Sequence, residues 1–162
     1  MKFEDIDVEQ ITIEKSIKNS YDIKLNNKSI DFWCPDLYVP FGLENKFNNY
    51  FLNLEIKNTN YEQLFQYFIE KFEKKIIELL DISKEELNSQ IRYDDKNTIL
   101  YTKIYEKYKK IITNVKDNSN EHKTIYDITK DQYIKVNLYV DKLWYMNNIY
   151  YYKLKLKDVI LV

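Results

Sequence analysis

The sequence contains no alanine, one glycine (Gly42), one arginine (Arg92) and one cysteine (Cys34). A lone cysteine cannot form an internal disulfide, which predicts a reducing compartment. One glycine excludes the glycine-rich loops that cradle nucleotide phosphates, and one cysteine with one histidine, His122, excludes the usual zinc-ligand spacings. No run of about 18 apolar residues is present, so no transmembrane helix is predicted, and the acidic start of the chain is unlike a signal or transit peptide. No cofactor is expected.

Lysine, asparagine, isoleucine and tyrosine stand where other proteins use arginine, alanine, glycine and proline. This composition is typical of an AT-rich genome, so the abundance of tyrosine is not by itself evidence of a function. The net charge is −1, which excludes a strongly basic chain. Residues 89–116, however, carry seven basic and three acidic residues, and residues 133–157 carry five lysines and one aspartate. These two segments can build a basic surface on a weakly acidic protein.

The length of 162 residues fits one domain, residues 1–162. Short alternating segments predict strands in both halves, and Pro35–Gly42 reads as an irregular loop. One long helix is expected over residues 60–82, because Thr59 and Glu62 form a capping box before an apolar stripe at helical spacing. The predicted fold class is mostly β with one long helix (α+β), an OB-fold-like antiparallel barrel with the helix inserted between barrel strands.

The last part of the chain predicts a hairpin of two strands, Tyr133–Tyr145 and Ile149–Val162. A two-residue loop would set apolar residues of the first strand opposite lysines of the second. A three-residue loop, Met146–Asn148, sets Val140 opposite Leu154 instead, and a slip of one residue would flip every side chain to the other face. We therefore predict the three-residue loop. In this register the core face carries Trp144, Tyr150 and Tyr152.

Aromatic and basic residues alternate on the outward faces of two predicted strands. In the strand Thr98–Tyr108 the inward face is apolar, whereas the outward face carries Tyr101, Lys103, Tyr105 and Lys107. Aromatic rings can stack on unpaired bases while lysines contact phosphates, and same-face residues of a strand recur about every 7 Å. An AT-rich genome would also encode many tyrosines and lysines on any solvent-exposed strand face, so the pattern also fits a β surface with no ligand. The last hairpin offers a second such face with Tyr139, Tyr151, Lys153 and Lys155.

Several segments of the chain form a recognisable set: Trp33–Glu44, Tyr50–Glu55, Ser89–Tyr93, the strand with Trp144, and Tyr151–Lys157. Together they resemble a known family, the OB-fold single-stranded DNA-binding proteins of nucleocytoplasmic large (giant) DNA viruses. That family is similar to the single-stranded DNA-binding proteins of tailed phages. The loop with Pro40-Phe41-Gly42 is the most specific part of the resemblance.

The resemblance implies a non-enzymatic, sequence-independent single-stranded DNA-binding protein that acts in viral DNA replication, recombination and repair. It implies an intracellular location, in the host cytoplasm or nucleus. Viral replication proteins and a second copy of the chain are candidate partners beside the DNA. Phage members carry an acidic C-terminal tail that recruits partners, and this sequence ends without one. The candidate DNA-binding residues are Trp33, Arg92, Tyr93, Tyr101, Lys103, Tyr105, Lys107, Tyr139, Tyr151, Lys153 and Lys155.

Other functions remain open from the sequence. Asp36, Glu55 and Lys57 fit the loose PD-(D/E)xK nuclease pattern, in which two carboxylates hold Mg²⁺ and a lysine positions the attacking water. Cys34 and His122 are a candidate nucleophile and base, although a lone strand cysteine is more often a buried hydrophobe. A non-catalytic interaction module or virion structural protein is the third alternative.

Overall fold

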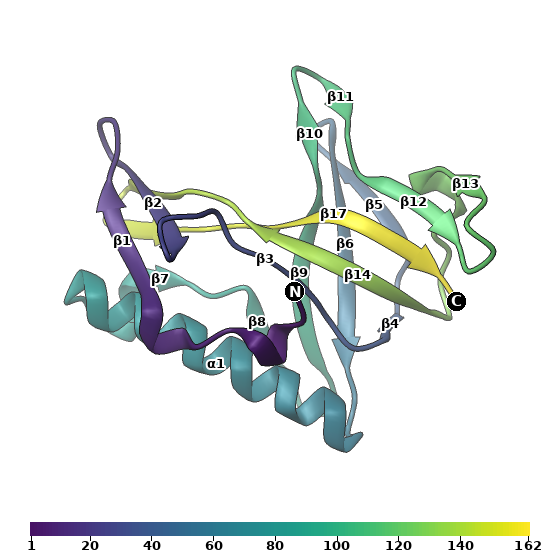
Figure 1. Ribbon diagram of the computed structural model, residues 1–162, viewed down its shortest axis with the longest axis horizontal. Helices are drawn as coiled ribbons and strands as arrows, with labels where there is room; N and C mark the ends of the chain where they lie inside the picture. The colour runs from purple at the N-terminus through teal and green to yellow at the C-terminus, as the bar shows by residue number, and fades with distance from the viewer.

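The computed structural model describes residues 1–162 and contains one α-helix, α1 (Asn60–Leu80), among short strands (Figure 1). Four short 3-10 turns lie at Phe3–Asp5, Val8–Gln10, Lys84–Glu86 and Ile125–Asp127. No helix combines the length and the apolar character that a membrane crossing requires. The strands are β1 (Ile11–Lys15), β2 (Ser20–Leu25), β3 (Asp31–Trp33), β4 (Leu37–Val39), β5 (Leu43–Lys46), β6 (Asn49–Ile56), β7 (Leu87–Asn88), β8 (Ile91–Tyr93), β9 (Thr98–Ile104), β10 (Glu106–Lys107), β11 (Lys110–Ile111), β12 (Asn114–Asp117), β13 (His122–Lys123), β14 (Gln132–Val140), β15 (Leu143–Met146), β16 (Ile149–Tyr151) and β17 (Leu154–Leu161).

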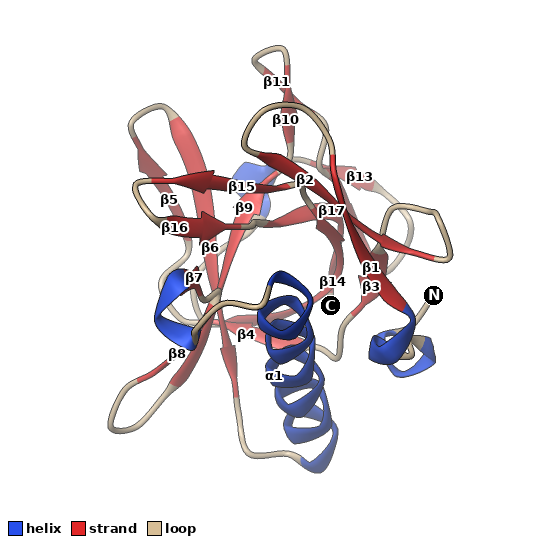
Figure 2. Ribbon diagram, turned by 90° about the vertical axis from the view of Figure 1, so that its left-hand side faces the viewer, coloured by secondary structure: helices blue, strands red, loops and turns tan.

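Five strands close a barrel in the order β14, β4, β6, β9 and β17, with β17 returning to β14 (Figure 2). The predicted OB-fold-like barrel with one long helix is therefore confirmed, and the helix lies in the chain between β6 and β9. One feature differs from the prediction: the barrel is mixed, because β9 and β17 pair in parallel. An odd number of strands cannot alternate in direction around a closed ring, so at least one neighbouring pair must be parallel.

Apolar side chains of the barrel strands fill the interior. Leu52, Leu54, Leu100, Leu138 and Leu156 have no exposed surface. Burial of side chains of this size contributes about 1.5–3 kcal/mol each relative to leaving them in water. The short strand β4 lies inside the segment 35–42 that the two prolines and the glycine predicted to be an irregular loop. Its three residues pair with β14, and Tyr38 also pairs with Glu55 of β6, so tertiary pairing overrides the local turn composition.

Helix α1 covers one side of the barrel, along the bottom of Figure 1. Thr59 accepts a hydrogen bond from the backbone of Glu62, as the capping box predicts. Glu62 in turn accepts from the backbone of Lys57 at 2.6 Å. The helix ends two residues before the predicted boundary, because Asp81 adopts a left-handed conformation with φ 52°. Its buried face contains Phe65, Phe68, Ile69, Phe72 and Ile76, whereas Leu64 is exposed.

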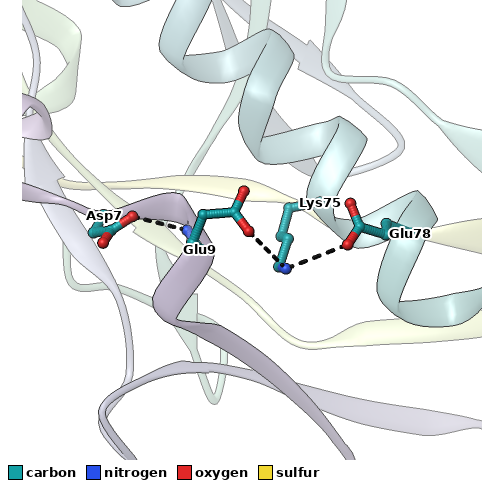
Figure 3. Close-up of polar contacts among 4 residues, drawn as sticks. All are labelled: Asp7, Glu9, Lys75 and Glu78. Atoms are coloured by element: carbon teal, nitrogen blue, oxygen red, sulfur yellow. Dashed lines mark hydrogen bonds and ion pairs between the residues drawn. The ribbon is translucent and has the colours of Figure 1, made fainter.

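The N-terminal segment is attached to α1 by polar contacts (Figure 3). The Lys75 ammonium lies 3.2 Å from a Glu9 carboxylate oxygen and 3.6 Å from one of Glu78. The Asp7 side chain accepts a hydrogen bond from the backbone of Glu9 at 3.0 Å, which fixes the turn that presents Glu9 to the helix. Exposed ion pairs of this kind add little stability individually, so the buried Phe3 ring, which packs on Phe65 and Phe68 of the helix, is the main anchor.

The terminal hairpin contains two registers. Between β14 and β17, Val140 lies opposite Leu154, as predicted. Between β15 and β16, Trp144 lies opposite Tyr151 and the tip is a two-residue turn, so the predicted three-residue loop is wrong. The register differs between the two strand pairs because the connecting segments differ in length. Three residues lie between Val140 and Trp144, whereas only two lie between Tyr151 and Leu154, so the alignment shifts by one residue. Of the side chains predicted to face the core, Tyr152 is fully buried, Tyr150 is partly buried against the core, and Trp144 stacks outside on Tyr151.

The predicted long strand Thr98–Tyr108 is broken after Ile104. The Thr113 hydroxyl accepts a hydrogen bond from the Tyr105 backbone at 2.8 Å and donates to the Leu156 carbonyl at 2.7 Å. This insertion of a side chain takes the place of a strand-to-strand bond. Beyond it, β10 leaves the barrel and pairs with β11 to form a projecting arm. After β12 the chain forms only the short strand β13, since a 3-10 turn follows it at Ile125–Asp127.

Candidate nucleic-acid interface

The outer face of β9 carries the predicted alternation. Leu100, Thr102 and Ile104 point inward and are buried, so Tyr101 and Lys103 between them project outward and remain partly exposed. Successive side chains of a strand point to opposite faces, so burying one face in the core is enough to turn Tyr101 and Lys103 outward.

Neighbouring strands extend this face across the barrel. Lys103 of β9 lies opposite Phe51 of β6 on one side and opposite Lys155 of β17 on the other. Lys155 in turn lies opposite Tyr139 of β14. Four strands therefore place an aromatic residue, two lysines and a second aromatic residue in one row.

Arg92 lies at one side of the row, on β8. Its guanidinium carbon is 4.6 Å from the centroid of the Tyr101 ring, a cation–π contact, and its Nη2 lies 3.5 Å from the Asn88 side-chain oxygen. A hollow on the surface joins these groups to the row. We call it the basic groove and define it by Phe51, Arg92, Tyr101, Lys103 and Lys153, which line it together with Asn88, Gln90, Thr102 and Leu154.

Three cations meet in the basic groove without a carboxylate. Arg92, Lys103 and Lys153 take part in none of the ion pairs of the chain. Burial lowers the pKa of Lys153, and the positive charges of Lys103 and Arg92 lower it further. The fold thus holds like charges together, and their repulsion lowers its stability. An anion bound in the groove would reduce this repulsion.

Stacked aromatic residues continue the face beyond the groove. The Tyr105 and Tyr139 rings are 5.2 Å apart at an angle of 17°. The ammonium groups of Lys107 and Lys155 lie 5.5 Å and 5.2 Å from the Tyr105 centroid. Lys155 also forms an ion pair of 2.8 Å with Asp141, so part of its charge is neutralised.

A second aromatic pair lies on the other side of the groove. The Trp144 and Tyr151 rings are 5.8 Å apart at an angle of 20°. Tyr151 is the register partner of Asn88, which lines the basic groove, and Lys153 lies two positions after Tyr151, with the buried Tyr152 between them. Flat rings therefore flank the cationic centre on both sides.

The strand β8 and the residues before it are positioned by a buried carboxylate of α1. Glu73 accepts hydrogen bonds from the Gln90 backbone at 2.8 Å, from the Ser89 hydroxyl and from the Tyr152 hydroxyl. Burial raises the pKa of Glu73, and these hydrogen bonds act in the opposite direction. The helix thereby fixes the segment that carries Gln90 and Arg92 into the groove.

Two of the predicted site residues lie elsewhere. Tyr93 alternates with Arg92 and points to the hollow beside α1, where partial burial and Glu70 raise its pKa to about 12. Trp33 lines a separate hollow with Tyr133 and Lys135. The structure brings together the remaining residues of the prediction, namely Arg92, Tyr101, Lys103, Tyr105, Lys107, Tyr139, Tyr151, Lys153 and Lys155.

Sequence reasoning missed two aromatic residues of this face. Phe51 shares the outward side of β6 with Asn53, and its partner Lys103 is far away in the sequence. The sequence did hold a signal for Phe51: Leu52, Leu54 and Ile56 alternate as the core face of the strand, which leaves Phe51 on the outward face. The alternation pattern places Trp144 on the core face, because the change of register within the hairpin is not encoded in it.

The residues of the rival catalytic patterns have other contacts. The Lys57 ammonium lies 3.9 Å from the centroid of the Tyr38 ring. No group of three histidine, cysteine, aspartate or glutamate side chains is placed to hold a metal ion. Burial raises the pKa of the Cys34 thiol, which disfavours a thiolate nucleophile, and His122 is exposed in the edge strand β13.

The sequence matches no protein-family model and no curated protein. Solved structures with the same fold do match. The single-stranded DNA-binding protein gp2.5 of bacteriophage T7 superposes with a TM-score of 0.57 at 16% identity, over 83% of this chain and 87% of that chain. The single-stranded DNA-binding protein of bacteriophage Enc34, in complex with single-stranded DNA, superposes with a TM-score of 0.59 at 10% identity, over 95% of this chain and 96% of that chain. At these identities the likeness is one of fold.

Proposed function

We propose that this protein binds single-stranded DNA without sequence preference and without catalysis. The observation that carries the proposal is the basic groove, in which Arg92, Lys103 and Lys153 lie together without carboxylate partners beside outward aromatic rings. A single strand offers a line of negative charge and flat unpaired bases, and this face offers cations and flat rings at matching intervals. The fold shared with phage single-stranded DNA-binding proteins supports the same conclusion.

The aromatic residues favour a single strand over a duplex. In a duplex the base faces are stacked on one another, so outward rings such as Tyr101 and Tyr151 would find no partner. Phosphate contacts alone would serve both forms. A groove with rings on both sides of its cations therefore fits an extended strand whose bases are free to stack.

A role in the replication, recombination and repair of a viral genome belongs to the same proposal. Its support is the resemblance of segments such as Trp33–Glu44 to proteins of giant DNA viruses, together with the fold of the phage proteins. An intracellular location follows from that role. Viral replication proteins and a second copy of the chain are the further partners that we propose.

Binding to single strands is expected to be far tighter than binding to duplex DNA of the same length. The measurement is fluorescence anisotropy with labelled oligothymidylate, a mixed-sequence strand and a duplex, all in one buffer. Two different strands should bind alike, because stacking accepts any base. The labelled strand should also be recovered at full length after incubation with Mg²⁺. Equal affinity for duplex and single strand would refute the proposal.

Binding is expected to weaken steeply with salt. Each lysine or arginine that contacts a phosphate releases counterions, which adds about −0.7 to the slope of log affinity against log salt on a single strand. Several cations line the face, so the slope should be several times this value. Arg92→Ala should make it shallower by about one contact, whereas the exposed helix variant Lys74→Ala should leave it unchanged. A slope near zero in the unaltered protein would be incompatible with a phosphate-binding groove.

A further inference from the structure

Four hairpin tips of the chain share one backbone geometry. Each is a two-residue turn whose residues are both left-handed, with φ between 51° and 66°. Turns of this kind favour asparagine and glycine, because other side chains strain the backbone there. Two tips follow the rule with asparagine pairs, and the other two begin with an aromatic residue. The four tips are Asn26–Asn27, Phe47–Asn48, Tyr108–Lys109 and Asn147–Asn148.

The two aromatic tips do nothing for the stability of the fold. Phe47 and Tyr108 are each 97% exposed, so neither ring packs on the protein. An exposed apolar ring in a strained backbone conformation is unfavourable on both counts, and asparagine, abundant in this sequence, would remove both penalties. Strain retained at a surface position in this way points to a use outside the folded chain.

The two tips project from the same end of the barrel, the top in both Figure 1 and Figure 2. Strands β6 and β9 are antiparallel, so the start of β6 and the end of β9 lie together. Two-residue steps along β6 lead from Phe51 of the basic groove to Phe47 at its tip. From Lys103 in β9 the chain leads through Tyr105 and through Lys107 in β10 to Tyr108 at the other tip.

We infer that Phe47 and Tyr108 form a second stacking element for single-stranded DNA, which takes the unpaired bases of a strand as it leaves the basic groove. The inference rests on the proposed function and extends its site. A ring that is free on both faces can stack on a base from either side. A hairpin tip that projects from the barrel can also contact a DNA strand that changes direction there. Lys107 and Lys109, which have no ion-pair partner, supply phosphate contacts beside the Tyr108 ring.

The test uses the double variant Phe47→Asn/Tyr108→Asn and two lengths of oligothymidylate. Asparagine tolerates the left-handed conformation, so the melting temperature should stay the same or rise. A strand of about six nucleotides fills only the groove, whereas one of about twenty reaches the tips. The double variant should bind the long strand at least about tenfold more weakly, because one stacked base alone is worth about that factor and two rings are removed. It should bind the short strand unchanged. The matched control is Ile17→Asn, which removes an exposed apolar side chain from another hairpin and should alter neither affinity.

Unchanged binding of both lengths by the double variant would overturn the inference, as would an equal loss on both. Tyr101→Ala keeps this result separate from the proposed function, because it removes a groove ring and should weaken both lengths. If the unaltered protein bound neither strand, the proposed function itself would fail.

Discussion

Replacing Arg92 or Tyr101 by alanine should each weaken binding to single-stranded DNA by roughly 1–3 kcal/mol, the range found for stacked or clasped groups. The Arg92 guanidinium lies over the Tyr101 ring at 4.6 Å, so each group holds the other in place. Truncating one therefore also disturbs its partner, and the double variant should lose less than the sum of the two single losses. Fluorescence anisotropy at fixed salt measures each loss.

The substitution Arg92→Lys separates charge from shape. Lysine keeps the positive charge but loses the flat guanidinium, which is needed both to stack on the ring and to hold a phosphate with two parallel hydrogen bonds. It should therefore restore only part of the affinity that alanine loses. Tyr151→Ala tests the flanking ring pair in the same way, and Lys74→Ala on α1 is the exposed control. If all these variants bound like the unaltered protein, with melting temperatures also unchanged, the groove would not be the DNA site.

Replacing Lys153 by methionine should weaken DNA binding and stabilise the fold at neutral pH. Burial, Lys103 and Arg92 hold the pKa of Lys153 below its usual value. The charged form is thus disfavoured in the folded state and costs stability at pH 7. That cost disappears as the pH rises through the folded pKa to the unfolded one. Methionine keeps most of the apolar stem and removes the charge.

Two measurements are needed for this variant. Thermal or urea unfolding should show that the variant has a higher free energy of unfolding than the unaltered protein at pH 7. This difference should shrink as the pH approaches the ordinary pKa of lysine. Anisotropy should show a loss of about tenfold in affinity, as expected for a charge-assisted contact. Lys157→Met in β17, the strand that follows Lys153, is the matched control: Lys157 pairs with Asp31 at 3.0 Å, so its loss should bring no gain in stability. A Lys153→Met protein that is less stable at pH 7 would contradict the account of the groove as a cluster of repelling charges.

Local signals in the sequence predicted much of the fold. The capping box at Thr59 and the apolar stripe located α1 to within two residues of its end. Apolar matching gave the register of β14 with β17. These features depend on neighbours in the chain or on one pair of strands. The strand β4 and the parallel contact of β9 with β17 depend on distant partners, so no local pattern encodes them.

Part of the candidate site could likewise be predicted from local patterns in the sequence, and part depends on distant partners. Alternation placed Tyr101, Lys103 and Lys155 outward, because a strand with one buried face has no other choice. Alternation could not say that Phe51 would lie beside Lys103, since that follows from the closure of the barrel. Arg92 and Tyr93 are consecutive in β8, so alternation places them on opposite faces, and only Arg92 reaches the basic groove.

The parallel contact between β9 and β17 also decides when this surface can exist. A ribosome delivers β9 long before β17, and until Leu154–Leu161 has emerged the barrel stays open along one seam. The nascent chain therefore exposes the inner faces of β6 and β9 throughout its synthesis, when unpaired edges are most exposed to aggregation. Such long-range closure is slow compared with helix formation. Lys103 and Lys155 become neighbours only in that last step, so a partly made chain does not yet present the cationic row to nucleic acid.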